Sequence, residues 1–155
     1  MIRRTKEYIL EKKMIKNNST VLVALSGGAD SVCLLLLLNE IKRQCADELD
    51  FALEAVHVEH GIRGAESRED ARFASDLCER LNIPCHVHFV DVPQYAASHG
   101  LGLEEAARIL RYEAFEKEVA RILRYEAFEE EAGRYPCETA DASDQKQGNS
   151  RQAVV

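Results

Sequence analysis

Residues 26–31, Ser-Gly-Gly-Ala-Asp-Ser, place two adjacent glycines, two hydroxyls and one carboxylate in a single short loop. The loop follows a continuously apolar segment, residues 21–25, and precedes a second apolar run. Such a loop presents consecutive backbone N–H groups at the start of a helix, where the unpaired amides and the helix dipole both favour negative charge. The pattern therefore predicts a polyphosphate-binding loop between a buried strand and a helix.

Other phosphate and nucleophile loops fit this segment less well. A Walker P-loop needs a lysine after its last glycine, and no lysine occurs between residues 20 and 41. A dinucleotide fingerprint needs three glycines spaced G-x-G-x-x-G, whereas the next glycine after Gly28 is Gly61. A hydrolase nucleophile elbow with Ser26 as nucleophile stays open, although it needs a late histidine and the last one here is His99.

Three further residues are candidates for the same site. A carboxylate would repel the phosphates of a bound anion, so the presence of Asp30 in this loop predicts a Mg²⁺ ion between its carboxylate and the phosphates. A second interpretation, in which Asp30 caps the following helix, stays open. His60 and Arg63 lie on a glycine-containing loop after the second apolar segment. Because ligands bind at the carboxyl ends of strands in α/β sheets, we favour function for both residues over a solvated loop.

Alternating apolar segments predict the elements that position this loop. We expect strands at residues 21–25, 52–58 and 86–90, and helices at residues 31–44, 67–81 and 93–98. Ser67 and Asp70, three residues apart, indicate a capping box at the start of the second helix. The order of strands and helices is typical of an α/β fold with a doubly wound, mainly parallel sheet, like the Rossmann fold.

The chain holds an internal repeat. The decapeptide ARILRYEAFE occurs at residues 107–116 and again, letter for letter, at residues 120–129. A unit this short does not form a solenoid, so we interpret the repeat as a recent duplication. At about 100° per residue, the two copies face different ways in one continuous helix. We therefore expect the first copy to dock on the sheet through Leu110 and Ala114, and residues 120–132, including Leu123, to continue as an exposed helix.

Other polar residues have simpler interpretations. Glu104 and Arg108 stand four residues apart and fit a surface ion pair. We expect His57 to pack within the sheet. His86 and His88 share one face of a strand, and without a third ligand nearby we do not favour a metal pair.

Composition sets the wider frame. The chain of 155 residues fits one domain, which we place at residues 1–133, with a polar, disordered tail at residues 134–155. The net charge of −7 restricts any nucleic-acid contact to a local patch. Five cysteines without CxxC spacing fit a reducing cytoplasm. The longest apolar run, residues 32–38, is shorter than the about 20 residues of a membrane span, so we expect no membrane partner.

Several motifs, in order, resemble a known family. The loop SGGADS matches the SGGxDS pyrophosphate loop of the PP-loop ATPases, which split ATP between its α and β phosphates. VEHGIR at residues 58–63 resembles the V-D-H-G-L-R of the bacterial tRNA(Ile)-lysidine synthetases, with Glu59 in place of the usual aspartate. Residues 100–116 are similar to their E-x-x-A-R-x-x-R-Y helix, in which the motif positions are held by Glu104, Arg108, Arg111 and Tyr112.

The resemblance implies a two-step ligase that uses ATP and Mg²⁺. ATP would activate the C2 carbonyl oxygen of the wobble cytidine of tRNA(Ile) with a CAU anticodon, and the amine of L-lysine would displace AMP. By this resemblance Asp30 and Arg108 would be catalytic, with Asp30 also the metal ligand. Arg108 would contact ATP or RNA, unless it only forms the surface ion pair with Glu104. The nucleotide would be bound by Ser26, Gly27, Gly28, Ala29, Asp30, Ser31, His60 and Arg63.

The chain departs from this family after residue 133. The segment ETADASDQKQG keeps the family's TA and DQ pairs, but Asp141 stands where the family has a histidine. The second acid of the family's D-D-Q metal-binding run, the following apolar helix and the RNA-binding domains are missing. We therefore expect a truncated N-terminal portion, either a working ligase or a catalytically inactive ATP-binding fragment. The sequence leaves the oligomeric state open.

Overall fold

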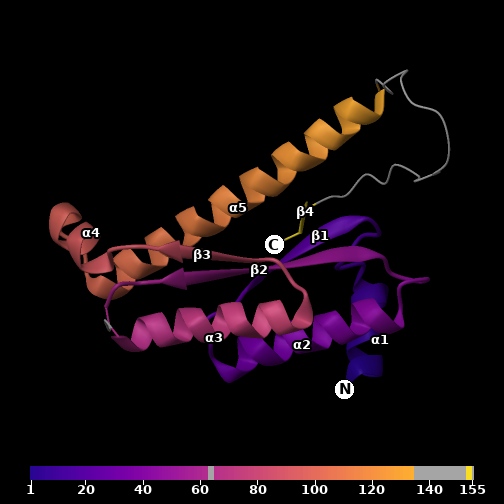
Figure 1. The fold of residues 1–155 in the computed structure, drawn as a ribbon, viewed down its shortest axis with the longest axis horizontal. Coiled ribbons are helices and arrows are strands. Elements are labelled where there is room, and N and C mark those ends of the chain that lie inside the picture. The colour runs from indigo at the N-terminus through magenta and orange to yellow at the C-terminus, as the bar shows by residue number, and fades with distance from the viewer. Residues whose placement is uncertain (63–64, 135–152, 155) are drawn as a thin grey trace.

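The computed structural model describes residues 1–62, 65–134 and 153–154 and is built around a parallel sheet (Figure 1). The strands lie in the order β3-β2-β1-β4, and every pairing is parallel. Along the chain the elements are α1 (Ile2–Lys12), β1 (Ser19–Ala24), α2 (Ala29–Gln44), β2 (Phe51–Glu59), α3 (Ala65–Leu81), β3 (Cys85–Phe89), α4 (Val92–His99), α5 (Leu103–Arg134) and β4 (Ala153–Val154).

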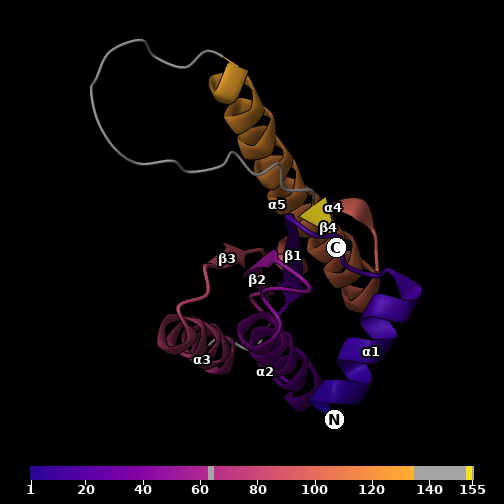
Figure 2. The same cartoon turned by 90° about the vertical axis from the view of Figure 1, so that its right-hand side faces the viewer.

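Helices cover both faces of the sheet. Viewed along the sheet, α2 and α3 lie on one face and α5 on the other (Figure 2). Successive residues of a strand point to opposite faces, and β1 follows this rule. Val21 and Val23 join the core under α2 and α3, whereas Leu22 packs with Val56 and Ile122 of α5. This arrangement confirms the predicted α/β fold with a doubly wound parallel sheet.

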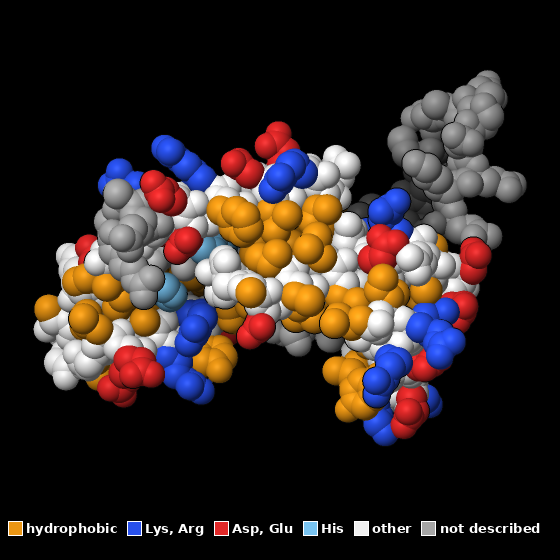
Figure 3. Space-filling view, turned by 90° about the horizontal axis from the view of Figure 1, so that it is seen from below, with side chains coloured by type: hydrophobic (Ala, Val, Ile, Leu, Met, Phe, Trp, Pro, Cys, Tyr) orange, Lys and Arg blue, Asp and Glu red, His pale blue; other side chains and the backbone are white. Residues whose placement is uncertain are grey.

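The main core lies between the sheet and α2 with α3. Its most deeply buried side chains include Leu35, Ile41, Phe51 and Cys78. The burial of a leucine, isoleucine or phenylalanine side chain stabilises the fold by about 1.5–3 kcal/mol. On the outer surface of this layer apolar side chains remain exposed (Figure 3), among them Leu34 and Leu36 of α2 and Phe73 of α3.

Helix α3 begins earlier than the sequence predicts. The helix already includes Ala65, so Ser67 lies within its first turn and is not the residue before it. The predicted capping box of Ser67 and Asp70 is therefore wrong, and these two side chains instead line a cavity. Helix α4 agrees with its prediction, because the backbone of Gly100 turns left-handed and ends the helix after His99.

Both copies of the decapeptide lie in one helix, α5, which runs for 32 residues. Ala114 is buried and Leu123 is exposed, as predicted. Leu110, however, packs in the cluster formed with α4 and not on the sheet. The second copy is also not wholly exposed, because Ile122 is only 4% exposed and packs on β1 and β2. Residues at i, i+4 spacing from Ala114 lie on the same face of the helix, so the buried face continues past the boundary between the two copies.

The end of the chain adds a short strand to the sheet. Ala153–Val154 forms β4 and pairs with Thr20 and Val21 at the free edge of β1. The predicted disorder of residues 134–155 is therefore wrong for these two residues, and α5 includes Arg134. The remaining part of the predicted tail, with Asp141, lies outside the described residues. Within the described part of the chain, no helix is long and apolar enough to cross a membrane.

Candidate nucleotide site

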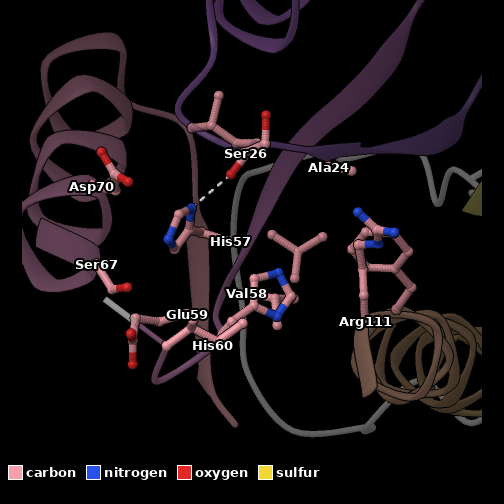
Figure 4. A pocket seen from close by; sticks show the side chains of 13 residues that line it. Ala24, Ser26, His57, Val58, Glu59, His60, Ser67, Asp70 and Arg111 are labelled. Atoms are coloured by element: carbon pink, nitrogen blue, oxygen red, sulfur yellow. Dashed lines mark hydrogen bonds between the residues drawn. The ribbon is translucent and has the colours of Figure 1, made fainter. Parts of the chain in front are cut away.

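The candidate site is a cavity of about 530 Å³ at the carboxyl ends of β1 and β2. Ser26 lies at the start of the glycine loop, and α3 and α5 supply side chains from opposite sides (Figure 4). Between them stand residues from the end of β2 and the loop after it. The wall combines apolar groups, such as Val56 and Phe115, with polar groups from each surrounding element.

The glycine loop is held in shape by its own two serines. The Ser31 hydroxyl accepts a hydrogen bond from the Ser26 N–H at 3.2 Å and donates to the Gly28 carbonyl at 2.9 Å. The two hydroxyl oxygens are 3.1 Å apart. Gly27 has a φ of 84°, a left-handed conformation that side chains with a Cβ rarely adopt. The loop is thus fixed in a conformation that leads directly into the first turn of α2.

The first turn of α2 is available to an anion. The N–H groups of Ala29, Asp30 and Ser31 open the helix, where no intrahelical acceptor exists for them. Gly28 is the residue before the helix, and no side chain caps it. The capping interpretation of Asp30 is therefore wrong, because this side chain lies inside the first turn. Asp30 is exposed, next to N–H groups that attract negative charge.

His57 and Glu59 at the end of β2 support the site. His57 is buried, and its Nδ1 donates a hydrogen bond of 2.7 Å to the Leu25 carbonyl just before the glycine loop. This contact confirms the prediction that His57 packs within the sheet. The Glu59 carboxylate accepts the Gly61 N–H at 2.9 Å and so holds the loop after β2 in place. Two side chains thus fix the two loops that meet at the cavity.

His60 carries an unsatisfied polar atom. Its Nδ1 is buried and has no hydrogen-bond partner among the residues that the structure describes. Burial lowers the pKa of His60, and the positive charge of Arg111 and a contribution from His57 lower it further, against the opposing effect of Glu59. The imidazole is therefore neutral near pH 7. A buried nitrogen without a partner in a cavity wall is a position where a ligand can supply the missing hydrogen bond.

Arg111 and Asp70 face the cavity from opposite helices. The Arg111 guanidinium extends from α5, and the Asp70 carboxylate extends from α3 toward the glycine loop (Figure 4). Asp70 Oδ1 is 3.8 Å from the point where a Cβ on Gly27 would stand. The cavity therefore has a cationic side at α5 and an anionic side at α3. Such a division of charge suits a ligand that carries both phosphate and a bound cation.

Comparison with known proteins places this site in a family. The family model described as PP-loop domain matches residues 1–122. This range includes the glycine loop, β2 and the first decapeptide. The chain belongs to the PP-loop domain family.

Individual relatives extend this result. The tRNA(Ile)-lysidine synthase of Clostridioides difficile (strain 630) is 44% identical over 109 residues, which are 69% of this chain and 22% of that protein. The tRNA(Ile)-lysidine synthase of Clostridium perfringens (strain ATCC 13124) is 40% identical over 117 residues, or 76% of this chain and 24% of that protein. This PP-loop chain thus spans about a quarter of the length of the curated relatives it matches.

Among solved structures, the U34-tRNA thiolase NcsA from Methanococcus maripaludis aligns with 57% of this PP-loop chain and 30% of its own chain. The sequence identity is 28% and the TM-score is 0.45.

The structure brings together only part of the predicted site of this PP-loop domain. Ser26 and His60 line the cavity, and residues 27–31 continue from Ser26 into α2. Arg108 is not among the lining residues, and its guanidinium lies 5.5 Å from the ring centre of Tyr112. Arg63 lies outside the described residues.

Three cavity residues were missed as site residues, although the sequence drew attention to each of them. Arg111 holds a position in the helix motif, and Ser67 and Asp70 formed the supposed capping box. Two polar residues three positions apart fit a helix cap, and they equally fit one face of a helix that points toward a ligand. The sequence alone does not distinguish these two cases.

Proposed function

We propose that this chain binds ATP with Mg²⁺ at the glycine loop, residues 26–31, which we call the PP-loop from here on, and in the adjoining cavity. The chain would be the nucleotide-binding part of a ligase of the tRNA(Ile)-lysidine synthase type. The observation that carries the proposal is the position of the PP-loop, whose open first turn of α2 lies beside a cavity holding Arg111 and the unpartnered Nδ1 of His60. Since the substrate would be tRNA, the proposal places the protein in the cytoplasm.

The phosphates would occupy the PP-loop. The N–H groups of Ala29, Asp30 and Ser31 attract negative charge, and the absence of a side chain on Gly27 and Gly28 lets a phosphate approach the backbone. The nucleoside would extend into the cavity, where Val56 and Phe115 offer apolar surface to a base.

The residues of the PP-loop fit a Mg²⁺ ion bound together with phosphate. Among the described residues no group of three or more histidine, cysteine or acidic side chains could enclose a metal. Mg²⁺ at nucleotide sites needs no such cage, because one or two carboxylates, phosphate oxygens and water complete its coordination. Asp30, exposed beside the open N–H groups, is the carboxylate we assign to it. When bound, the ion would neutralise charge that develops on the departing pyrophosphate.

The proposed reaction has two balanced steps. In the first, the C2 oxygen of the wobble cytidine forms a bond to the α-phosphorus of ATP, and pyrophosphate leaves. In the second, the amine of lysine bonds to C2 and loses a proton, and the C2–O bond breaks to release AMP. Arg111 and the N–H groups of the PP-loop would stabilise the negative charge on phosphate in the first step. Arg108, exposed beside Tyr112, would be available to the RNA.

A second candidate function is ATP binding without turnover. The specific observation that favours it is the share of the relatives that this chain spans, about a quarter of their length. We therefore expect nucleotide binding from this chain but no incorporation of radioactive lysine into unmodified tRNA(Ile). Labelled tRNA would establish the working ligase instead.

Calorimetry with ATP, with and without Mg²⁺, tests the binding proposal. We expect ATP binding that strengthens with Mg²⁺, and we expect Asp30→Ala to remove the Mg²⁺ dependence while leaving the urea midpoint unchanged. Asp47→Ala, a change of the same type in the segment between α2 and β2, serves as the control. A folded sample without ATP heat would rule out the proposal, and an unchanged Mg²⁺ dependence in Asp30→Ala would exclude the metal role of Asp30.

A further inference from the structure

A second polar cluster lies outside the cavity, on the face of the sheet that α5 covers. It joins three elements through five side chains, here called the α5 cluster: Glu54 of β2, His86 and His88 of β3, and Glu118 and Arg121 of α5. Its residues have no part in the proposed nucleotide contacts. The two histidines share one strand face, as the sequence predicts, and both point to carboxylates.

Arg121 is the centre of this cluster. Its Nε donates to the Glu118 carboxylate at 2.6 Å, and its Nη2 donates to the Glu54 carboxylate and to His86 Nε2, the latter at 2.9 Å. His88 Nε2 is 2.7 Å from the other Glu118 oxygen. One guanidinium therefore bridges a carboxylate of the sheet and a carboxylate of the helix.

The cluster is buried enough for these bonds to matter. Glu118 is 6% exposed, and a carboxylate at such a position needs partners because it has lost its water. Burial acts to raise the pKa of Glu118, but hydrogen bonds from Arg121 and His88 outweigh it, so the pKa lies below its ordinary value. Removal of Arg121 would leave both Glu54 and Glu118 without their shared cation, which is costly when a charge is buried.

The cluster is placed to control the cavity. Arg111, Phe115, Glu118 and Ile122 recur at the spacing that puts side chains on one face of a helix. The first two line the cavity, and the last two are buried against the sheet one to two turns further on. Because a helix is rigid over this distance, the point where α5 is tied to β2 and β3 determines where Arg111 and Phe115 stand.

Arg121 is the counterpart of Arg108 in the second copy of the decapeptide. Arg108 and Arg121 occupy the same position in the two decapeptides, and each guanidinium lies over the tyrosine of its own copy, at 5.5 and 6.0 Å from the ring centre. Arg108 is exposed, whereas Arg121 reaches the sheet. An offset of 13 residues turns the second copy by about 140° relative to the first, so identical sequences present the same arginine to different surroundings.

We propose that Arg121 is a positioning residue, which joins Glu54 of β2 to Glu118 of α5 and thereby sets Arg111 and Phe115 in the nucleotide cavity. The proposal rests on the proposed ATP binding for its functional consequence. Its structural half, that Arg121 fixes the place of Arg111, stands independently of any ligand.

A double-mutant cycle tests the functional half. Arg121→Met keeps the length of the side chain and removes its charge, and we expect it to weaken ATP binding by about tenfold, within the range of coupling between residues that act together. In an Arg111→Met background the same change should have a clearly smaller effect, because only Phe115 remains to be displaced. Equal losses in both backgrounds, or no loss in either, would overturn the proposal.

Arg124→Met is the matched control. Arg124 lies in the same decapeptide, is exposed, and its Nε bonds to the Ala120 carbonyl of its own helix. We expect ATP binding of this variant to equal that of the parent chain. If Arg121→Met fails to fold in urea titrations, Glu54→Gln, which keeps the shape of the sheet partner, replaces it in the same cycle with the same expected and opposing outcomes.

Nuclear magnetic resonance tests the structural half without ATP. The Arg111 Nε–H and Phe115 ring signals should shift in Arg121→Met and remain in place in Arg124→Met. Unchanged Arg111 and Phe115 signals in a folded Arg121→Met would overturn the positioning role. If the parent chain does not bind ATP, the proposed function fails, and these signals still decide the role of Arg121.

Discussion

His60 and Gly61 form the residue pair on which the loop after β2 depends. His60 keeps a buried Nδ1 without a partner among the described side chains and backbone groups, while Gly61 turns the chain next to it with a φ of 67°. The two residues therefore combine a ligand-facing atom with a backbone conformation that only glycine adopts without strain. We make a separate prediction for each of these two residues.

Binding of ATP should transfer a proton to His60. Burial, Arg111 and His57 lower the pKa of His60, and the negative phosphates would oppose this effect and raise it. We expect proton uptake on binding near pH 6, measured as a dependence of the calorimetric enthalpy on the ionisation enthalpy of the buffer. His60→Asn should keep only the contribution of ATP itself. Identical buffer dependence in the two proteins would place His60 away from the phosphates.

Gly61→Ala should destabilise the fold. A Cβ at this position would stand 3.1 Å from the Val90 carbonyl oxygen, and the left-handed backbone costs an alanine about 1–2 kcal/mol. Urea unfolding measures the loss. Gly102→Ala is the control, because nothing lies within 4 Å of its Cβ position, and we expect a change within about 0.5 kcal/mol. Equal effects at both glycines would contradict the steric explanation.

At the residue scale, the sequence located the glycine loop between a strand and a helix, because adjacent glycines between apolar runs mark a turn. It also drew attention to His60, which lines the cavity. It selected Arg108 as a site residue, whereas Arg111 is the one that lines the cavity. Both stand in one helix motif. Which face of α5 meets the cavity depends on the packing of Ala106 against α4 and on the burial of Ala114. That rotation follows from tertiary packing, which residue spacing does not contain.

At the scale of elements, α5 shows how the repeat places identical side chains in different surroundings. Ile109 and Ile122 hold the same position in the two copies, yet only Ile122 is buried against Leu22 and Val56. Helical periodicity correctly predicts that the copies face different ways. The predicted extent of the contact between α5 and the sheet was wrong, because the length of the sheet under α5 decides where the helix loses contact with the sheet.

Ile122→Ala should therefore cost far more stability than Leu123→Ala. The first change removes a side chain packed between α5 and the sheet and should lower the free energy of unfolding by about 2–4 kcal/mol. Leu123 is 49% exposed, and its replacement should change stability by no more than about 0.5 kcal/mol. Urea titration of both variants gives the comparison. A costly Leu123→Ala would show that α5 is docked through another face.

At the scale of the whole molecule, the α5 cluster links stability to pH. The pKa of Glu118 lies below its ordinary value, so the ionised carboxylate favours the folded state. This contribution is present above the pKa of the unfolded chain, near 4.3, and is lost as pH falls through the lower folded value. Arg121, Glu54, His86 and His88 are the charged or titratable groups that face it.

Glu118→Gln should consequently be less stable than the parent chain at pH 7, and the two stability curves should converge as the pH falls below 4. Urea midpoints measured from pH 7 to pH 3 provide the test. Glu116→Gln, which changes an exposed carboxylate of the same helix, should follow the parent curve throughout. Parallel curves for Glu118→Gln and the parent chain would show that the folded pKa of Glu118 is not depressed.

The order of the sheet was the most predictable property of the molecule, and its far edge the least. Short apolar strands separated by helices permit few arrangements other than consecutive parallel neighbours, and β1, β2 and β3 adopt this one. The pairing of Ala153–Val154 with β1 could not be predicted, because two residues carry no periodic pattern.

The strand order also determines when each part of the fold can form during synthesis. The pairings of β1 with β2 and of β2 with β3 join strands that follow one another along the chain, whereas β1 with β4 joins a strand near the start to residues at the end. Contacts between nearby segments form sooner, and chains fold from the N-terminus as the ribosome releases them. We therefore expect the PP-loop to take shape on the nascent chain, and Ala153–Val154 to add to a sheet that already exists.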